Sequence, residues 1–322
     1  MTGRLRDDPD ALNALVSRAA QHQGVNPAYV EKDFWVTEVL RVASRPRVIA
    51  GSDLSAEFIF KGGTSLSRVF GLIDRFSEDI DLLVAFPSGP GLGSRHAVLK
   101  QIDAEVAAHL GVPGGVGAST TGVKRDTTYV YPPSFPGGGL REGVLLEMGS
   151  RGGTHPASLH PLRSMVAIYA GEVLGEGDSA WEEFAPFDVN VLAPERTLLE
   201  KLAAVHAAAS AGDAHALVKA GRHFYDIAQL LSSPTVTDAL DALGPHGVRE
   251  LAADVDRHSE SAGFAWSARP DGGFADSPAF DARAPGHADV VRGYEAALGL
   301  VYGDKPPFSF VLETVNAHRK HL

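Results

Sequence analysis

The segment from residue 58 to residue 84 constrains the fold of this 322-residue chain more than any other. A short β-prone run at residues 58–60 stops at Gly62-Gly63 and is followed by hydroxyl side chains that can cap a helix. Residues 79–84 then alternate acidic and apolar side chains before becoming wholly apolar. The pattern predicts a strand, a glycine turn, a helix and a second strand, and therefore an α/β unit in this half of the chain.

The second predicted strand carries two carboxylates, Asp79 and Asp81. Alternate residues share a strand face, so these side chains project together while Ile80 and Leu82 point to the core. Two neighbouring carboxylates repel each other unless a cation lies between them, and Mg²⁺ prefers such oxygen ligands. An Asp-x-Asp alone is more typical of a solvated strand edge.

The glycine turn supplies a second part of the pattern. Gly62 and Gly63 let the backbone approach a phosphate closely, and the helix that follows offers free N–H groups to an anion. Hydroxyls of Thr64 and Ser65 can add hydrogen bonds to the same phosphates. A Gly-Gly alone is usually an ordinary turn, but the turn, the helix and the Asp-x-Asp strand in this order indicate nucleotide chemistry.

The combination resembles the first motif of the polymerase-β-type nucleotidyltransferase superfamily. More narrowly, KGGTSLS at residues 61–67, RFSEDIDL at 75–82 and EKDFWVT at 31–37 resemble the AbiEii/AbiGii toxins, which are nucleotidyltransferase-like toxins of toxin–antitoxin and abortive-infection systems. The resemblance covers most of residues 28–232. It implies an α+β fold, with a polymerase-β-like nucleotidyltransferase core built on a small mixed sheet and a helical C-terminal lobe.

Three residues further along the chain match later features of that family. Glu147 ends a predicted strand and is either the third acid of the metal site or a surface glutamate at a strand end. Lys201 borders a predicted apolar helix face, so it either extends to solvent or neutralises triphosphate charge, and the resemblance favours the second role. Asp226 either orients Lys201, touches the nucleotide or pairs with Arg222 four residues earlier.

Residues 222–227 depart from the family pattern, because His223 stands where an arginine usually precedes an acid. Closer to the aspartates, Arg75 either binds phosphate or pairs with Glu78, and Ser77 either bonds substrate or caps the turn. The predicted catalytic residues are Asp79, Asp81, Glu147 and Lys201, of which the first three would hold the metal. The predicted nucleotide-binding residues are Gly62, Gly63, Thr64, Ser65, Arg75, Ser77, Lys201 and Asp226.

The spacing of apolar residues and the positions of glycine and proline predict the remaining elements. Helices are expected within residues 10–45 and at 98–110, 195–209, 221–231 and 310–321, strands at 127–131 and 143–148, and loops at 111–117, 132–139 and 269–284. The change to a helical pattern lies somewhere in residues 155–192. We therefore expect an α/β domain at 1–175, which includes the N-terminal helices, and a helical domain at 176–322.

Composition excludes several classes of function. The chain has no cysteine, which rules out disulfides, thiolate nucleophiles and cysteine–zinc sites. Its net charge of −11 makes it a poor non-specific binder of nucleic acid, although a local basic groove remains compatible with a structured RNA. No apolar run is long enough to span a membrane, and acidic residues stand where a signal peptide would be apolar, so a cytoplasmic protein is expected.

The resemblance implies a magnesium-dependent toxin that transfers NMP from an NTP, with CTP or GTP favoured. The implied acceptor is RNA, with the 3′ end of tRNA favoured, and the implied partner is a cognate antitoxin. One alternative is transfer to a hydroxyl of a small molecule or protein. Another is a non-catalytic nucleotide-binding module, which is favoured if Glu147 lies far from Asp79 and Asp81.

Overall fold

The computed structural model describes residues 3–77, 79–135, 137 and 139–322. The chain divides into two units, each of which is assembled from separate segments. Unit 1 consists of Met1–Thr64, Ser77–Ser150 and Ala157–Val191, and unit 2 consists of Ser65–Phe76, Arg151–Pro156 and Leu192–Leu322. The expected division into domains at 1–175 and 176–322 stays a prediction. Glu78, the alternative partner of Arg75, lies outside the described residues.

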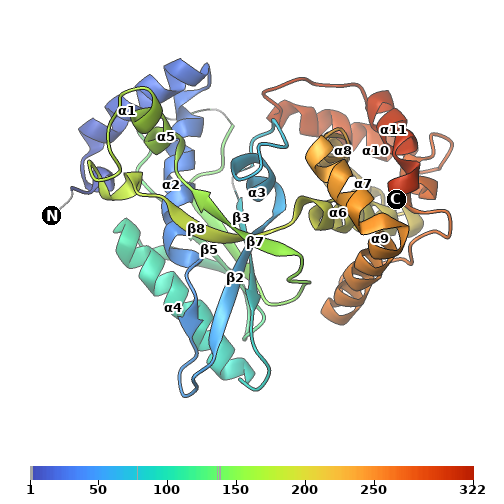
Figure 1. Ribbon diagram of the computed structural model, residues 1–322, viewed down its shortest axis with the longest axis horizontal. Helices are drawn as coiled ribbons and strands as arrows, with labels where there is room; N and C mark the ends of the chain where they lie inside the picture. The colour runs from blue at the N-terminus through green and yellow to red at the C-terminus, as the bar shows by residue number, and fades with distance from the viewer. Residues whose placement is uncertain (1–2, 78, 136, 138) are drawn as a thin grey trace. The chain divides into compact units, whose positions relative to one another are not determined.

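A mixed sheet forms the centre of unit 1 (Figure 1). Its strand order is β4-β5-β6-β3-β2-β8-β7, with β1 paired to β2. Strands β2 and β3 are antiparallel, whereas β3 pairs with β6 and β2 pairs with β8 in parallel. The strands are β1 Arg47–Val48, β2 Ser55–Lys61, β3 Asp79–Ala85, β4 Gly114–Thr120, β5 Lys124–Tyr129, β6 Val144–Gly149, β7 Ala157–Leu162 and β8 Phe187–Leu192.

The helices of unit 1 are α1 Pro9–Gln23, α2 Pro27–Ala43, α4 Leu92–Leu110 and α5 Met165–Glu172. Asp8 and Asn26 cap the first turns of α1 and α2, each with a proline at the helix start, as their sequences favour. Helix α2 contacts β6 and also packs against α1, α4 and α5, while α4 contacts β4 and β5. As a result α2 is buried on nearly all sides, charged residues included.

From Leu192 onward unit 2 is helical (yellow to red in Figure 1). Its helices are α6 Pro194–Ser210, α7 Ala214–Lys219, α8 Gly221–Leu231, α9 Pro234–Ala262, α10 His287–Ala297 and α11 Phe308–Ala317. One apolar core joins α6 and α8, through residues such as Leu202 and Phe224, to Leu66 and Ile73 from the short segment 65–76. The helix α3 Gly62–Arg68 continues from β2 and carries the chain from unit 1 into unit 2.

The expected α+β class, with a mixed sheet and a helical C-terminal part, is confirmed. The interpretation of residues 111–117 as a loop is wrong, because β4 begins at Gly114 and pairs with β5. Nearly all of β4 is exposed and glycine-rich, so it lacks the apolar alternation that marks a strand. Across the described residues, no helix has both the length and the hydropathy needed to cross a membrane.

Candidate active site

The two aspartates of the Asp-x-Asp motif lie on one face of β3, as the alternation predicted. Ile80 between them is fully buried, whereas Asp79 and Asp81 are partly exposed. Strand pairing then fixes the neighbours of Asp81, which lies opposite Lys61 of β2 and opposite Glu147 of β6. The third predicted carboxylate therefore stands directly beside the second on the adjacent strand.

The register extends this arrangement by one more strand, because Asp126 of β5 lies opposite Glu147. Four ionisable residues thus form a row across β2, β3, β6 and β5, which we call the ionisable row. Its members are Lys61, Asp81, Glu147 and Asp126. Lys124 of β5 lies close to it, with Nζ 2.9 Å from Asp126 Oδ2 and 4.0 Å from Glu147 Oε1.

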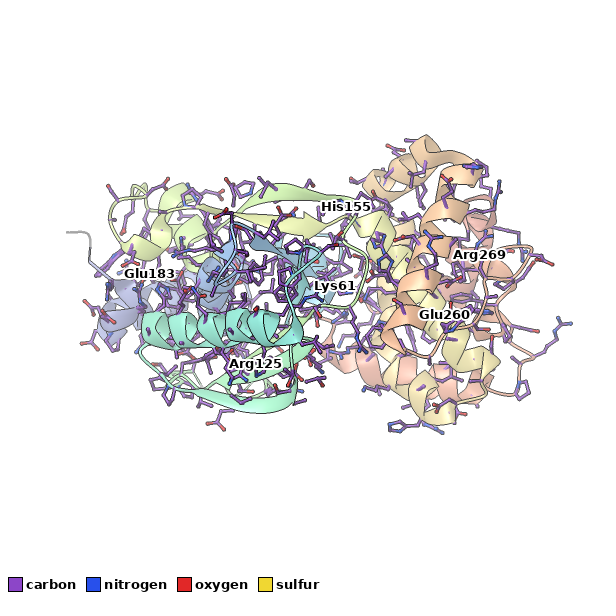
Figure 2. The ribbon with its side chains drawn as sticks, turned by 90° about the horizontal axis from the view of Figure 1, so that it is seen from below. Lys61, Arg125, His155, Glu183, Glu260 and Arg269 are labelled. Carbon is purple, nitrogen blue, oxygen red and sulfur yellow. The ribbon has the colours of Figure 1, made fainter. Side chains whose placement is uncertain are left out.

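The ionisable row faces away from helix α4. On β5 the alternate residues Arg125 and Thr127 point the other way, since both bond the carboxylate of Asp103 on α4. Figure 2 shows Arg125 next to this helix. The side of the sheet opposite α4 is therefore the acidic one.

Crowding of carboxylates changes the protonation of Glu147. Burial and the neighbouring charges of Asp81 and Asp126 raise the pKa of Glu147 to about 7, and its carboxyl group is hydrogen-bonded to Asp81. The ammonium group of Lys124 opposes this rise only in part. A carboxyl group with a pKa near neutrality can both accept and release a proton at physiological pH.

We expect the shifted pKa of Glu147 to appear in the pH dependence of stability. Its ordinary pKa is 4.5, so between about pH 4.5 and about pH 7 the folded protein binds more protons than the unfolded chain. The free energy of unfolding should therefore fall as the pH rises through this interval and level off above it. Urea midpoints measured from about pH 4.5 to pH 8 should show this slope in the wild type and lose it in Glu147→Gln; equal slopes would contradict the assignment.

The donor chemistry of the acidic face fits the magnesium ion that the sequence predicted. Asp81 and Glu147 present hydrogen-bonded carboxyl groups, and a cation would replace the shared proton and relieve their repulsion. No group of three His, Cys, Asp or Glu side chains in the described part of the chain is close enough to hold an ion by itself. Magnesium commonly takes only one or two carboxylates and completes its shell with phosphate oxygens and water, which suits this pair.

Gly62 makes the close approach of α3 to β3 possible. Its φ of +80° lies in the left-handed region, and a Cβ atom built on it would lie 2.2 Å from Oδ2 of Asp81. The next turn is fixed by Thr64, whose Oγ1 donates to the carbonyl oxygen of Asp79 at 2.6 Å and lies 2.9 Å from Oγ of Ser77. The hydroxyl of Thr64 thus joins the start of α3 to the start of β3.

Gly62→Ala is expected to displace the carboxylate of Asp81 and to lower transfer activity by at least about tenfold, because catalytic groups must be placed precisely. The matched control is Gly51→Ala, since Gly51 has a φ of +81° and a Cβ atom added to it would meet nothing within 4 Å. Both variants should lose about 1–2 kcal/mol from backbone strain, measured by urea unfolding. Equal activity in the two variants would show that the contact with Asp81 is unimportant.

Unit 2 contains a separate buried cluster around Asp226. The carboxylate of Asp226 accepts hydrogen bonds from Nε and Nη2 of Arg75 at 2.6 and 2.7 Å, and lies 2.8 Å from Nζ of Lys201. Asp226 has no exposed surface, and Arg75 and Lys201 are also buried. Burial alone would raise the pKa of Asp226, but the charges of Lys201 and Arg75 outweigh it and hold that pKa well below its usual range.

These contacts show which partners Asp226 has and whether Lys201 is exposed, two points on which the sequence allowed alternatives. Asp226 pairs with Arg75 and Lys201, and Lys201 is buried rather than extended into solvent. His223 lies 3.5 Å from Lys201, and burial together with that ammonium group lowers the pKa of His223 to about 3. The side chain of Lys201 therefore lies between a carboxylate and a neutral imidazole.

The structure thus places the predicted site residues in two sets. Asp79, Asp81, Glu147, Gly62, Gly63, Thr64 and Ser77 belong to unit 1, and Ser65, Arg75, Lys201 and Asp226 belong to unit 2. Thr64 and Ser65 are buried, and their contact with phosphates stays a prediction, as do the roles of Lys201 and Asp226 at the nucleotide. Sequence reasoning missed Asp126, because it placed the start of that strand at residue 127 rather than at Lys124.

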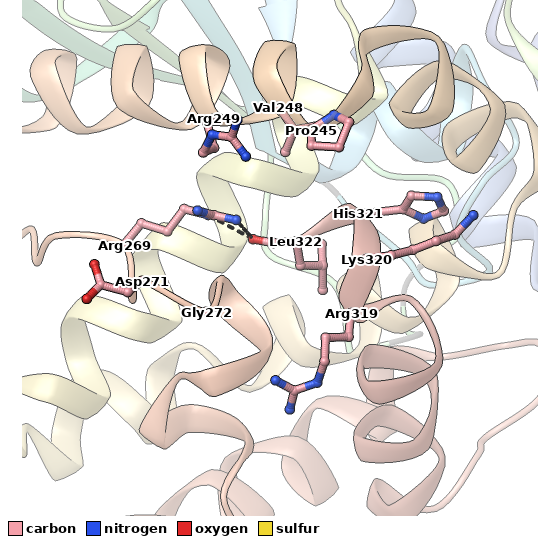
Figure 3. Close-up of a pocket in the computed structure, with 10 residues that line it drawn as sticks. All are labelled: Pro245, Val248, Arg249, Arg269, Asp271, Gly272, Arg319, Lys320, His321 and Leu322. Carbon is pink, nitrogen blue, oxygen red and sulfur yellow. Dashed lines mark hydrogen bonds between the residues drawn. The ribbon is translucent and has the colours of Figure 1, made fainter.

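Unit 2 also has a pocket of about 200 Å³ between the second half of α9, residues 269–272 and the C-terminal end of the chain. Most of its charged lining is cationic, including Arg249, Arg269 and Arg319, with Asp271 as a carboxylate. Figure 3 shows Arg269 reaching the carbonyl oxygen of Leu322, to which its Nε donates at 2.8 Å. None of the predicted site residues is among those drawn lining this pocket.

A comparison with protein families agrees with the motifs. A family profile described as "Nucleotidyl transferase AbiEii toxin, Type IV TA system" matches residues 47–312. Among solved structures, the chain is similar to MenT4, a nucleotidyltransferase toxin from Mycobacterium tuberculosis H37Rv, with 23% sequence identity, a TM-score of 0.38 and coverage of 96% of this chain and 95% of that one. No curated protein matches the chain.

Proposed function

The chain belongs to the AbiEii family of nucleotidyltransferase toxins of type IV toxin–antitoxin systems, and from that premise we propose that Asp79, Asp81 and Glu147 are its catalytic carboxylates. A nucleotidyltransferase takes an NTP as substrate, and a toxin of this kind has a cognate antitoxin. The observation that most supports the assignment is the position of Glu147 directly opposite Asp81 on the neighbouring strand. A non-catalytic module would not need two carboxylates held in register where their like charges repel each other.

In the proposed reaction, an acceptor hydroxyl oxygen attacks the α-phosphorus of the NTP. A new O–P bond forms, the bond to the β-phosphate breaks, and pyrophosphate leaves. Glu147, which lies directly opposite Asp81 on the neighbouring strand, accepts the hydroxyl proton. Asp81 and Glu147, with Asp79 on the same face of β3, would hold Mg²⁺ together with phosphate oxygens and water, and the ion when bound would supply positive charge to the phosphates and orient them.

The glycine turn has a complementary role in this proposal. Gly62 carries no side chain, so the backbone at the start of α3 lies directly against the carboxylate of Asp81. Gly62, Gly63 and Thr64 would line the triphosphate, with Ser77 next to them. The resemblance also assigns Ser65, Arg75, Lys201 and Asp226 to the nucleotide, and within unit 2 Asp226 would hold the two cations in place. These residue roles extend the sequence resemblance and rest on it.

We propose RNA as the acceptor, with the 3′ end of tRNA as the attacked hydroxyl and CTP or GTP as the donor. The resemblance to the toxin family supports this choice, and an acceptor bound through structure rather than non-specific charge suits a chain of net charge −11. The test incubates the protein with total tRNA, Mg²⁺ and each of the four α-labelled NTPs. Label should enter tRNA, and tRNA with a periodate-oxidised 3′ end should stay unlabelled.

Other outcomes of that assay would replace parts of the proposal. Label found on protein or on a small molecule would move the acceptor to that class. Transfer that persists in excess EDTA would exclude magnesium and the proposed role of the carboxylates in holding it.

A further inference from the structure

The segment EKDFWVT at residues 31–37 has no part in the proposed chemistry, yet its charged side chains are buried in α2. Glu31 is 2% exposed and Lys32 is completely buried. Burying charged groups is expensive and contributes little to stability compared with apolar residues of similar size. The groups to which these two side chains are hydrogen-bonded therefore show which part of the chain they hold in place.

Both side chains bond backbone groups in residues 130–143, the connection between β5 and β6. The carboxylate of Glu31 accepts from the N–H groups of Ser134 and Phe135 at 2.8 and 3.1 Å. The ammonium group of Lys32 donates to the carbonyl oxygens of Arg141, at 2.8 Å, and Gly143. The connection is thus held near both of its ends by two adjacent residues of one helix.

Two further contacts fix the ends of the connection. Trp35, one helical turn after Glu31, stacks on Tyr131 with ring centroids 5.1 Å apart and an interplanar angle of 18°. At the other end, Gly143 has a φ of +69°, and a Cβ atom there would lie 2.5 Å from the carbonyl oxygen of Tyr129. The backbone at Arg141 and at Gly143, two residues later, is therefore held in place.

Arg141 is the residue that this arrangement brings to the acidic face. Its Nη1 lies 3.3 Å from Oδ1 of Asp79, while its side chain remains 54% exposed. A guanidinium group presents several donors in a plane that matches phosphate oxygens. A triphosphate approaching Asp79 and Asp81 needs such a cation beside them to offset charge repulsion.

We propose that Arg141 is a nucleotide-binding residue whose guanidinium group contacts the triphosphate, and that Glu31 and Lys32 are positioning residues that hold it there. The inference rests on the proposed function of Asp79 and Asp81, because it takes the triphosphate to lie at that face. It gives the segment at residues 31–37 a role in binding rather than in the chemical step.

The test is the affinity of the full-length protein for non-hydrolysable α,β-methylene NTPs in Mg²⁺, measured by calorimetry. Arg141→Ala should weaken binding about tenfold, and Arg141→Lys should restore only part of the loss, because lysine lacks the planar donors. The control Arg18→Ala removes the same charge from an exposed position on α1 and should leave affinity unchanged. Equal affinity of Arg141→Ala and the wild type would overturn the proposal.

A double-mutant cycle separates positioning from general stability. Glu31→Gln keeps the shape of the side chain but weakens its hold on the two N–H groups, and we expect about threefold weaker binding. In an Arg141→Ala background the same change should have no further effect, whereas an equal loss in both backgrounds would overturn the positioning role. If the substitutions of Arg141 and Glu31 weaken binding as expected but the wild-type protein shows no nucleotidyl transfer, the result refutes the proposed function and leaves the binding role of Arg141 standing.

Discussion

Asp81→Asn is expected to reduce nucleotidyl transfer by about 10³-fold or more while leaving the protein folded. Asp81 connects two parts of the site, since it is hydrogen-bonded to Glu147 and lies against Gly62. An asparagine has the same shape but no negative charge, so it would weaken any metal bound there. The initial rate of label transfer from an α-labelled NTP measures the loss.

The same substitution should not destabilise the fold at a pH where Glu147 is ionised, because the two carboxylates then repel each other. Near pH 8, where Glu147 is ionised, the urea midpoint of Asp81→Asn should equal or exceed that of the wild type. Asp79→Ala should likewise abolish transfer and toxicity with the fold intact. The control is Asp188→Asn, an exposed aspartate on β8, and an equal loss of activity in it would show that the effect is not specific to the acidic face.

Asp226→Asn is expected to lower the free energy of unfolding of unit 2 by about 3–5 kcal/mol, the second large effect. The change leaves the cations of Arg75 and Lys201 buried without the carboxylate that both of them bond. Urea unfolding followed by circular dichroism measures the loss. Replacing Lys201 with methionine in the same chain should recover part of it, since one of the two uncompensated charges is then removed.

Asp241→Asn is the matched control for this prediction. Asp241 pairs with Lys320 and His321 in the same unit, but its side chain is 57% exposed, so the change should alter the urea midpoint far less than Asp226→Asn does. The pKa of Asp226 is held below its usual range, so its contribution to stability is present above about pH 4 and is lost only as the pH falls through that lower value. The difference between Asp226→Asn and the wild type should therefore persist at neutral pH and shrink in acid; no difference at pH 7 would contradict the cluster.

Local patterns in the sequence were sufficient to predict the features that lie within one strand, turn or helix. The alternation at residues 79–84 correctly predicted β3 and the shared face of its aspartates, and the glycines correctly predicted the turn from β2 into α3. The spacing of Leu198, Leu202 and Val205 predicted a buried face of α6, and all three residues are buried. In these cases the signal and its structural consequence lie within a few residues of each other.

The remaining features depend on pairings between distant parts of the chain. Arg75 and Asp226 are 151 residues apart, and Lys32 and Arg141 are 109 apart, so no local pattern marks either pair. Asp126 joins the ionisable row only because β5 pairs in register with β6. Strand β4 has no apolar face of its own and exists through its pairing with β5.

The most direct test of nucleotidyl transfer compares α-labelled and γ-labelled NTP as donors to the same tRNA in Mg²⁺. Attack at the α-phosphorus predicts that the α-label enters tRNA, that the γ-label appears only in pyrophosphate, and that Asp81→Asn loses both signals. Entry of the γ-label into an acceptor would show phosphoryl transfer instead. Undiminished transfer of the α-label by Asp81→Asn would remove the carboxylates of β3 from the reaction and contradict the account.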